Sequence, residues 1–137
     1  MTYLLDTNVW AQYLNGRSSA IRNKLRVVDL TKVFTCSIVK SELAYGAFKS
    51  LNPTQTYQKQ KNFLSLFISL PFDDDAALIF GRLMARLEER GLMISIKDLQ
   101  IASIALANNC TLVTHNVREF DRIIELNIED WEIDESL

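Results

Sequence analysis

Cysteine, proline and glycine are scarce in this chain, which has two cysteines, two prolines and four glycines among 137 residues. So few glycines and prolines exclude a collagen-like or low-complexity protein. The two cysteines, Cys36 and Cys110, cannot build a disulfide framework, and reduced thiols are typical of intracellular proteins.

Long apolar runs are missing as well. No run approaches the ~20 residues that are needed to cross a bilayer. The first residues, MTYLLDTNVW, lack the basic region and the cleavage site of a signal peptide. We therefore expect a cytoplasmic protein that does not associate with membranes.

Several common catalytic motifs do not occur. The chain has no G-x-S-x-G motif, no P-loop and no G-x-G-x-x-G fingerprint. A zinc site would have to combine the single histidine, His115, with Cys36 and Cys110, and the spacing of these residues contains no C-x-x-C pair. The two cysteines are better explained as core residues.

The formal net charge of −2 hides an uneven distribution. Residues 119–137 contain eight acids and one base, whereas residues 1–118 contain 14 bases and nine acids. The body of the chain is therefore basic, which permits binding to a polyanion without proving it.

The pattern of the chain predicts a single α/β domain spanning residues 1–137. Short runs rich in β-forming residues predict strands at 3–5, 33–36 and 111–114, and a short extended piece at 71–72. Apolar periodicity and capping residues, including Ser37 and Thr54 as N-caps, predict helices at 8–14, 20–26, 38–51, 54–69, 73–91, 96–107 and 117–124. Strands that alternate with helices indicate a parallel sheet covered on both faces.

Polar residues follow two of the expected strands. Asp6 comes directly after the first strand, and Asn116 and Glu119 follow the strand that ends at Thr114. Ligand sites of parallel sheets form beyond the carboxyl ends of the strands. Each of these residues also has a purely structural explanation, since Asp6 can cap a helix and Asn116 with Glu119 matches a capping box.

Two further acids lie on helices. Glu42 shares one helix face with Val39 and Leu43, where a carboxylate needs a cation or a salt-bridge partner. Asp98 begins an apolar helix face, and together with Ser95 it also fits a capping box.

The combined arrangement is more informative than any single acid. A parallel sheet would gather the strand ends, and with them these carboxylates, at one edge. Crowded carboxylates repel one another, and oxygen-only ligands suit Mg²⁺ or Mn²⁺. Such an ion could support the hydrolysis of a phosphodiester.

Basic and aromatic residues suggest binding surfaces. Arg82, Arg86 and Arg90 recur at intervals of four residues and could contact phosphates together with Lys97 and Arg118. An ordinary solvated helix face is the alternative explanation, and for Arg82 it is the favoured one. Aromatic residues are dense in the two helices expected between residues 38 and 69. Most must be core residues, but the two helices could also form a projecting hairpin that presents a groove to a partner.

Each candidate acid lies in a short block of sequence. The four blocks are Leu4-Leu5-Asp6-Thr7-Asn8, Ser41-Glu42-Leu43-Ala44-Tyr45-Gly46, Ile96-Lys97-Asp98-Leu99-Gln100-Ile101-Ala102 and Leu112-Val113-Thr114-His115-Asn116-Val117-Arg118-Glu119-Phe120. These blocks resemble the acidic blocks of PIN-domain ribonucleases, and in particular of the VapC toxins of bacterial toxin–antitoxin pairs. They occur in the family's order, and the similarity covers essentially the whole chain.

This resemblance implies a PIN-like α/β/α sandwich with a central parallel sheet and a projecting helical hairpin. It also implies an endoribonuclease that depends on Mg²⁺, with Mn²⁺ as a substitute. By the family pattern, Asp6 and Asp98 would bind the metal, and Glu42 and a fourth residue would complete the catalytic set. Many relatives carry Asp at the position of Asn116, whereas the most similar group uses the position of Glu119.

The resemblance extends to substrates and partners. Thr114, Asn116, Arg118 and Arg86 are the residues that we expect to contact substrate. The most similar group cleaves initiator tRNA in the anticodon loop. Such toxins are bound by a VapB-type antitoxin, and they commonly form homodimers and larger toxin–antitoxin complexes.

Our hypothesis from the sequence is therefore a metal-dependent endoribonuclease that uses water and leaves a 5′-phosphate. One alternative is a catalytically silent PIN-like module that only binds RNA. Another is a phosphoryl-transfer protein with Asp6 as nucleophile, although the chain lacks the second acid that such a site has near its nucleophile.

Overall fold

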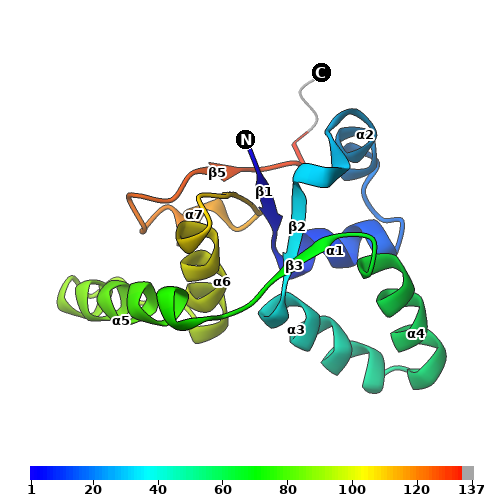
Figure 1. Ribbon diagram of the computed structural model, residues 1–137, viewed down its shortest axis with the longest axis horizontal. Coiled ribbons are helices and arrows are strands. Elements are labelled where there is room, and N and C mark those ends of the chain that lie inside the picture. The colour runs from blue at the N-terminus through cyan, green and yellow to red at the C-terminus, as the bar shows by residue number, and fades with distance from the viewer. Residues whose placement is uncertain (134–137) are drawn as a thin grey trace.

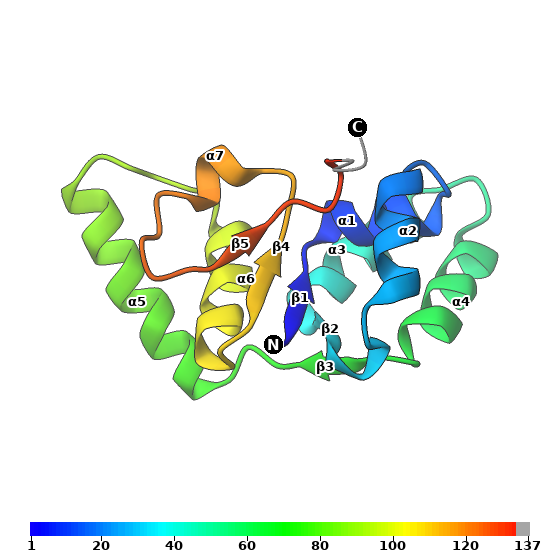
Figure 2. The same ribbon diagram turned by 90° about the horizontal axis from the view of Figure 1, so that it is seen from above.

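A five-stranded sheet forms the centre of the computed structural model, which describes residues 1–133 (Figures 1 and 2). The strands lie in the order β3-β2-β1-β4-β5, and every neighbouring pair is parallel. Their bounds are β1 (Tyr3–Leu5), β2 (Val33–Cys36), β3 (Ile68–Leu70), β4 (Thr111–Val113) and β5 (Ile128–Glu129). The predicted α/β class with a parallel sheet is confirmed.

Helices surround this sheet. They are α1 (Thr7–Leu14), α2 (Ser19–Val27), the short 3₁₀ helix η1 (Leu30–Lys32), α3 (Ser37–Phe48), α4 (Pro53–Leu64), α5 (Asp74–Glu89), α6 (Ile96–Ala107) and α7 (Val117–Phe120). Figure 1 shows α5 and α6 packed together at one end, and α3 and α4 as a hairpin that projects at the other. Among the helices of residues 1–133, none is both long and apolar enough to span a membrane.

The core includes the region where β1 and β4 pair. Leu4 and Leu5 on β1 and Leu112 and Val113 on β4 are fully buried. Helix α6 covers this region with six buried residues, and it is apolar on nearly all sides because it lies inside the domain. Aromatic side chains join α1 to the segment that follows α4, where Trp10 packs edge-to-face against Phe67. The core thus fixes the ends of β1 and β4.

The strand order creates a switch point between β1 and β4. From the central β1, the chain first adds β2 and β3 on one side and later adds β4 and β5 on the other. In open parallel sheets, ligand sites form beyond the carboxyl ends of strands at such a reversal. Asp6 follows β1, and residues 114–116 follow β4, so both lie at this position.

The prediction of a helix over 54–69 is wrong at its end. Helix α4 ends at Leu64, and Ile68–Leu70 instead form β3, paired with β2 in parallel register. Backbone pairing with β2 prevails here over the apolar pattern, which cannot separate a short strand from a buried helix. The strand stops before Pro71, since proline has no N–H to donate to the ladder.

Other boundaries also differ from prediction. Helix α3 ends at Phe48 rather than at 51, and α7 ends at Phe120 rather than at 124. Ser37 is the first residue of α3 and not its cap, and its hydroxyl accepts the N–H of Phe72. The cap of α4 is Asn52 instead of Thr54. Strand β5 was not predicted, and part of the acidic end, residues 134–137, lies outside the described residues.

Candidate active site

Asp6 is the most buried of the candidate acids. It is 6% exposed and caps α1, with its Oδ1 accepting the N–H of Val9 at 3.0 Å. Its Oδ2 accepts a hydrogen bond from the hydroxyl of Thr114, at the end of β4. Burial raises the pKa of Asp6 to about 6, against the lowering effect of these two hydrogen bonds, and the charges of Asp98 and Glu132 raise it further. Asp6 is therefore a helix cap and also a desolvated carboxylate.

Glu42 lies half-buried on α3, one of the helices that pack against α1. Its Oε1 accepts the hydroxyl of Thr7 at 2.8 Å, which ties α3 to the first turn of α1. The alternative explanation for Glu42 was a salt bridge to a lysine or arginine, and among residues 1–133 Glu42 forms no such salt bridge. The carboxylate is thus held in place by a neutral donor.

Asp98 lies in the first turn of α6. Ser95 caps this helix by accepting the N–H of Asp98 at 3.2 Å, which confirms one half of the predicted capping box. Burial raises the pKa of Asp98, the Ser95 hydroxyl lowers it, and the negative charges of Glu119 and Glu42 raise it further. Asp98 on α6 is therefore close enough to Glu119 on α7 and to Glu42 on α3 to be repelled by each of them.

Glu119 and Asn116 act as a pair. The side-chain amide of Asn116 donates to Glu119 Oε2 at 2.7 Å, and the backbone N–H of Ser95 donates to Glu119 Oε1 at 3.1 Å. The side chain of Asn116 makes no helix cap, so the predicted capping box does not form here. Glu119 supplies the negative charge, and Asn116 orients it.

The four candidate carboxylates share the chemistry that a hard cation requires. Asp6, Glu42, Asp98 and Glu119 come from four distant segments, and within the described part of the chain none of them is paired with a Lys, Arg or His side chain. All of their donors are hydroxyl or N–H groups, which leave the negative charge in place. Carboxylate oxygens with uncompensated charge fit Mg²⁺ or Mn²⁺, whose binding would relieve the repulsion.

The expected substrate residues fall into two groups. Thr114 is buried beneath Asp6, and the exposed Asn116 and Arg118 lie beside it, at the start of α7. Arg86 lies on α5 and makes two hydrogen bonds of 2.8 Å with the carboxylate of Glu125. Its guanidinium therefore already has an anionic partner.

Sequence reasoning missed the residues that support the acids. Thr7 was interpreted only as the start of a helix, although it directly follows Asp6 in the first acidic block. His115 was interpreted as a turn residue that could touch substrate. Its contacts with Asp130 and Glu132 depend on β5, which carries too few residues to show a periodic signal.

For the phosphodiester cleavage that the sequence predicts, we expect the substitution Thr114→Val to shift the acidic limb of the pH–rate profile to higher pH. The change keeps the shape of the side chain but removes the donor that lowers the pKa of Asp6. A hydrogen bond to a charged group contributes about 1.5–3 kcal/mol, which corresponds to roughly one to two pH units. Single-turnover rates between pH 5 and 9 measure this shift.

Thr35→Val is the matched control for this substitution. Thr35 is also fully buried, but its hydroxyl has no hydrogen-bond partner among the described residues. Its removal should leave the profile unchanged. Equal profiles for the two variants would show that Thr114 does not tune Asp6.

Comparison with known proteins gives a consistent result. The family description "PIN domain" matches residues 3–126. Ribonuclease VapC2 of Rickettsia felis is 38% identical over 133 residues, which cover 96% of this chain and 99% of that protein. The tRNA(fMet)-specific endonuclease VapC of Salmonella typhimurium is 33% identical over 131 residues, covering 96% of this chain and 98% of that protein. A chain in the crystal structure of VapBC2 from Rickettsia felis, bound to a DNA fragment from its promoter, is 39% identical and superimposes with a TM-score of 0.87, with coverage of 96% and 99%.

Proposed function

Because this chain belongs to the VapC ribonucleases of the PIN-domain family, we propose that it is a toxin that cuts initiator tRNA in the anticodon loop and so blocks translation. The observation that supports this proposal is that the charges of Asp6, Glu42 and Glu119 each interact with that of Asp98, while none of the four acids forms an ion pair with a basic side chain among residues 1–133. The tRNA(fMet)-specific relative supports the choice of substrate.

In this proposal Asp6 and Asp98 hold Mg²⁺, and Glu42 and Glu119 complete the site. A bound Mg²⁺ supplies positive charge at the reacting phosphate and makes an attacking water more acidic. The chain's own contribution is to fix the four carboxylates. Thr114 holds Asp6, Thr7 holds Glu42, and the Ser95 N–H and Asn116 amide hold Glu119.

Water is the nucleophile in this mechanism. Attack by water breaks the bond to the 3′-oxygen and leaves one product with a 5′-phosphate. Attack by the ribose 2′-hydroxyl would instead leave a cyclic phosphate and a free 5′-hydroxyl. The single histidine, His115, is held by two carboxylates, so the site offers no pair of histidines for that second route.

A tRNA cleavage assay tests this function. We expect purified protein with Mg²⁺ to cut initiator tRNA, but not an elongator tRNA, within the anticodon loop, and to leave a 5′-phosphate that a ligase accepts. EDTA should stop the reaction, and Mn²⁺ should restore it. Binding without product in either metal would favour the alternative, an RNA-binding module without catalysis.

Arg118 and Arg86 allow a comparison of the RNA surface. Arg118 is exposed beside Asn116, whereas Arg86 is engaged by Glu125. We expect Arg118→Gln to reduce the slope of log affinity for RNA against log salt by roughly 0.7–1, the value for one lost phosphate contact. Arg86→Gln should change the slope less. Fluorescence anisotropy in EDTA measures both slopes. An equal reduction of the slope in the two variants would place Arg86 on the RNA surface as well.

An apolar groove between α1, α2 and α4 is the surface that we propose for a VapB-type antitoxin. The solved relatives include VapBC complexes. The groove has a volume of about 790 Å³, and its apolar lining includes Leu25, Phe63 and Leu66, with Arg22 and Arg26 among its charged residues. From the sequence we expected the whole hairpin over 38–69 to contact the antitoxin. Of the two helices of that hairpin, only the second lines this groove. A homodimer and a larger toxin–antitoxin complex belong to the same proposal.

Leu66→Glu should weaken antitoxin binding on the order of 100-fold. Leu66 is 75% exposed and lines the groove, so the new charge is harmless in the free chain but becomes buried in the complex. Leu51→Glu is the matched control, because Leu51 is 99% exposed at the α3–α4 turn and is not among the groove residues. Titration calorimetry with the cognate antitoxin separates the two variants. A loss of antitoxin affinity in Leu51→Glu alone would contradict this proposal and indicate that the antitoxin contacts the tip of the hairpin.

A further inference from the structure

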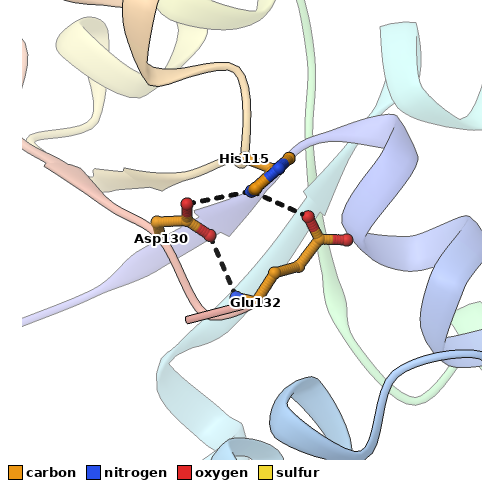
Figure 3. Close-up of side chains that lie close together, drawn as sticks. All are labelled: His115, Asp130 and Glu132. Atoms are coloured by element: carbon orange, nitrogen blue, oxygen red, sulfur yellow. Dashed lines mark hydrogen bonds and ion pairs between the residues drawn. The ribbon is translucent and has the colours of Figure 1, made fainter. Parts of the chain in front are cut away.

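A second cluster of metal-ligating side chains lies beside the four acids. His115 Nδ1 is 2.9 Å from Asp130 Oδ2 and 3.0 Å from Glu132 Oε2, and Figure 3 shows all three groups pointing toward one another. Among the described residues, these three form the one group of at least three His, Cys, Asp or Glu side chains whose ligand atoms all lie within 4.8 Å of one another. It shares no residue with the four-carboxylate site.

The fold builds this cluster from two adjacent strand ends. His115 follows β4, and Asp130 follows β5, which pairs with β4. The N–H of Glu132 donates to Asp130 Oδ1 at 3.0 Å, which fixes the turn that brings Glu132 back toward His115 (Figure 3). Trp131, which lies between Asp130 and Glu132 in the sequence, is buried and packs edge-to-face against Tyr3, with ring centroids 5.2 Å apart. The two carboxylates are therefore held in place by the core.

The charge of the cluster favours a divalent ion over a proton. One imidazole nitrogen faces two carboxylate oxygens, but it carries a single proton, so the protonated cluster keeps a formal net charge of −1. With a divalent ion in place of that proton, the histidine is neutral and the charges of the two carboxylates are balanced. The side chains of Asp130 and Glu132 are only 10% and 20% exposed, which makes residual charge there costly.

The ligand set also selects the kind of ion. One imidazole nitrogen with two carboxylate oxygens is a borderline set that suits Zn²⁺ better than Mg²⁺, which prefers oxygen. Three ligands about 2.1 Å from a tetrahedral ion lie roughly 3.4 Å apart. The distances of 2.9 and 3.0 Å from His115 Nδ1 to the two carboxylates are a few tenths of an ångström shorter, and all three ligand atoms lie within 4.8 Å of one another. The side chain of His115 is 66% exposed, which leaves room for that movement and for water as a further ligand.

We propose that His115, Asp130 and Glu132 form a second metal site, which binds a borderline divalent ion such as Zn²⁺ through the Nδ1 nitrogen of His115. The site is separate from the proposed Mg²⁺ site and does not depend on ribonuclease activity. It differs from the zinc set considered from the sequence, because Cys36 and Cys110 are buried in the core and take no part. The two sites are nevertheless electrostatic neighbours, since the charge of Glu132 reaches Asp6.

The single histidine makes a direct test possible. In the full-length chain without a histidine tag, long-range ¹H–¹⁵N NMR reports only the two ring nitrogens of His115. We expect Zn²⁺ to shift the Nδ1 resonance to that of a metal-bound nitrogen and to saturate at one equivalent. Mg²⁺ at millimolar concentration should leave both resonances in place. No shift with Zn²⁺, or a shift confined to Nε2, would overturn the proposal and leave an ordinary ion pair.

Variants separate this site from the others. Glu132→Gln should weaken Zn²⁺ binding at least about tenfold. Glu125→Gln, a matched change in a glutamate that pairs with Arg86, should not weaken it. Asp98→Asn should also leave it intact, because Asp98 belongs only to the four-carboxylate site. Loss of the Zn²⁺ shift in Asp98→Asn, or equal losses in the two glutamate variants, would contradict a separate site.

Discussion

Replacing Asp98 by asparagine should reduce the rate of RNA cleavage on the order of 10³-fold and leave the fold intact. The change keeps the size of the side chain and removes one of the two charges that we propose hold the metal. A catalytic metal contributes several kcal/mol of charge stabilisation, and each 1.36 kcal/mol corresponds to tenfold in rate. Because the pKa of Asp98 is raised in the metal-free chain, losing its charge should cost the fold little.

Asp75→Asn is the matched control for this experiment. Asp75 also lies in the first turn of a helix, α5, but it is exposed and is not one of the four acids. Both variants lose a favourable interaction with a helix dipole, which contributes about 0.3–1 kcal/mol. Cleavage rates under single-turnover conditions, with circular dichroism as a check of folding, compare them. Full activity of Asp98→Asn would remove the proposed mechanism.

Asp6 should make the metal-free protein less stable as the pH rises. Its carboxyl group binds a proton more tightly in the folded chain, where its pKa is about 6, than in the unfolded chain, where it is near 3.8. Raising the pH through this window therefore favours unfolding. The difference corresponds to about 3 kcal/mol of stability, fully present below pH 4 and lost above pH 6.

Asp6→Asn isolates this contribution. Asparagine caps a helix as well as aspartate does, so α1 keeps its cap while the titrating group is removed. Urea unfolding in EDTA at pH 5 and pH 8 should show a smaller loss of stability with pH for the variant than for the wild type. Mg²⁺ should stabilise the wild type at pH 8. It should stabilise the wild type at pH 5, and the variant at either pH, to a smaller extent. Identical pH dependence in both proteins would contradict a buried, desolvated Asp6.

The sequence was sufficient to single out four candidate acids but not the residues that hold them. Asp6 and Glu119 follow expected strands, and Glu42 and Asp98 stand out on apolar helix faces, so local patterns reveal them. The hydrogen bond from Thr7 to Glu42 joins residues 35 positions apart, and it depends on how α1 packs against α3. No local pattern encodes that angle.

Short strands limited the prediction in the same way. Ile68–Leu70 lie in an apolar stretch that continues from α4, and only pairing with β2 makes them a strand. Strand β5 has too few residues to show alternation, yet it places Asp130 next to His115. For this reason the cluster of His115, Asp130 and Glu132 could be found only in the folded chain.

The most direct test of the central claim is a crystal structure of the protein grown with Mn²⁺, with anomalous scattering measured at the manganese edge. We predict an anomalous peak between the carboxylates of Asp6 and Asp98, with Glu42 and Glu119 facing it, and loss of that peak in Asp98→Asn. Crystals that contain Mn²⁺ but show no peak at these carboxylates would contradict the account.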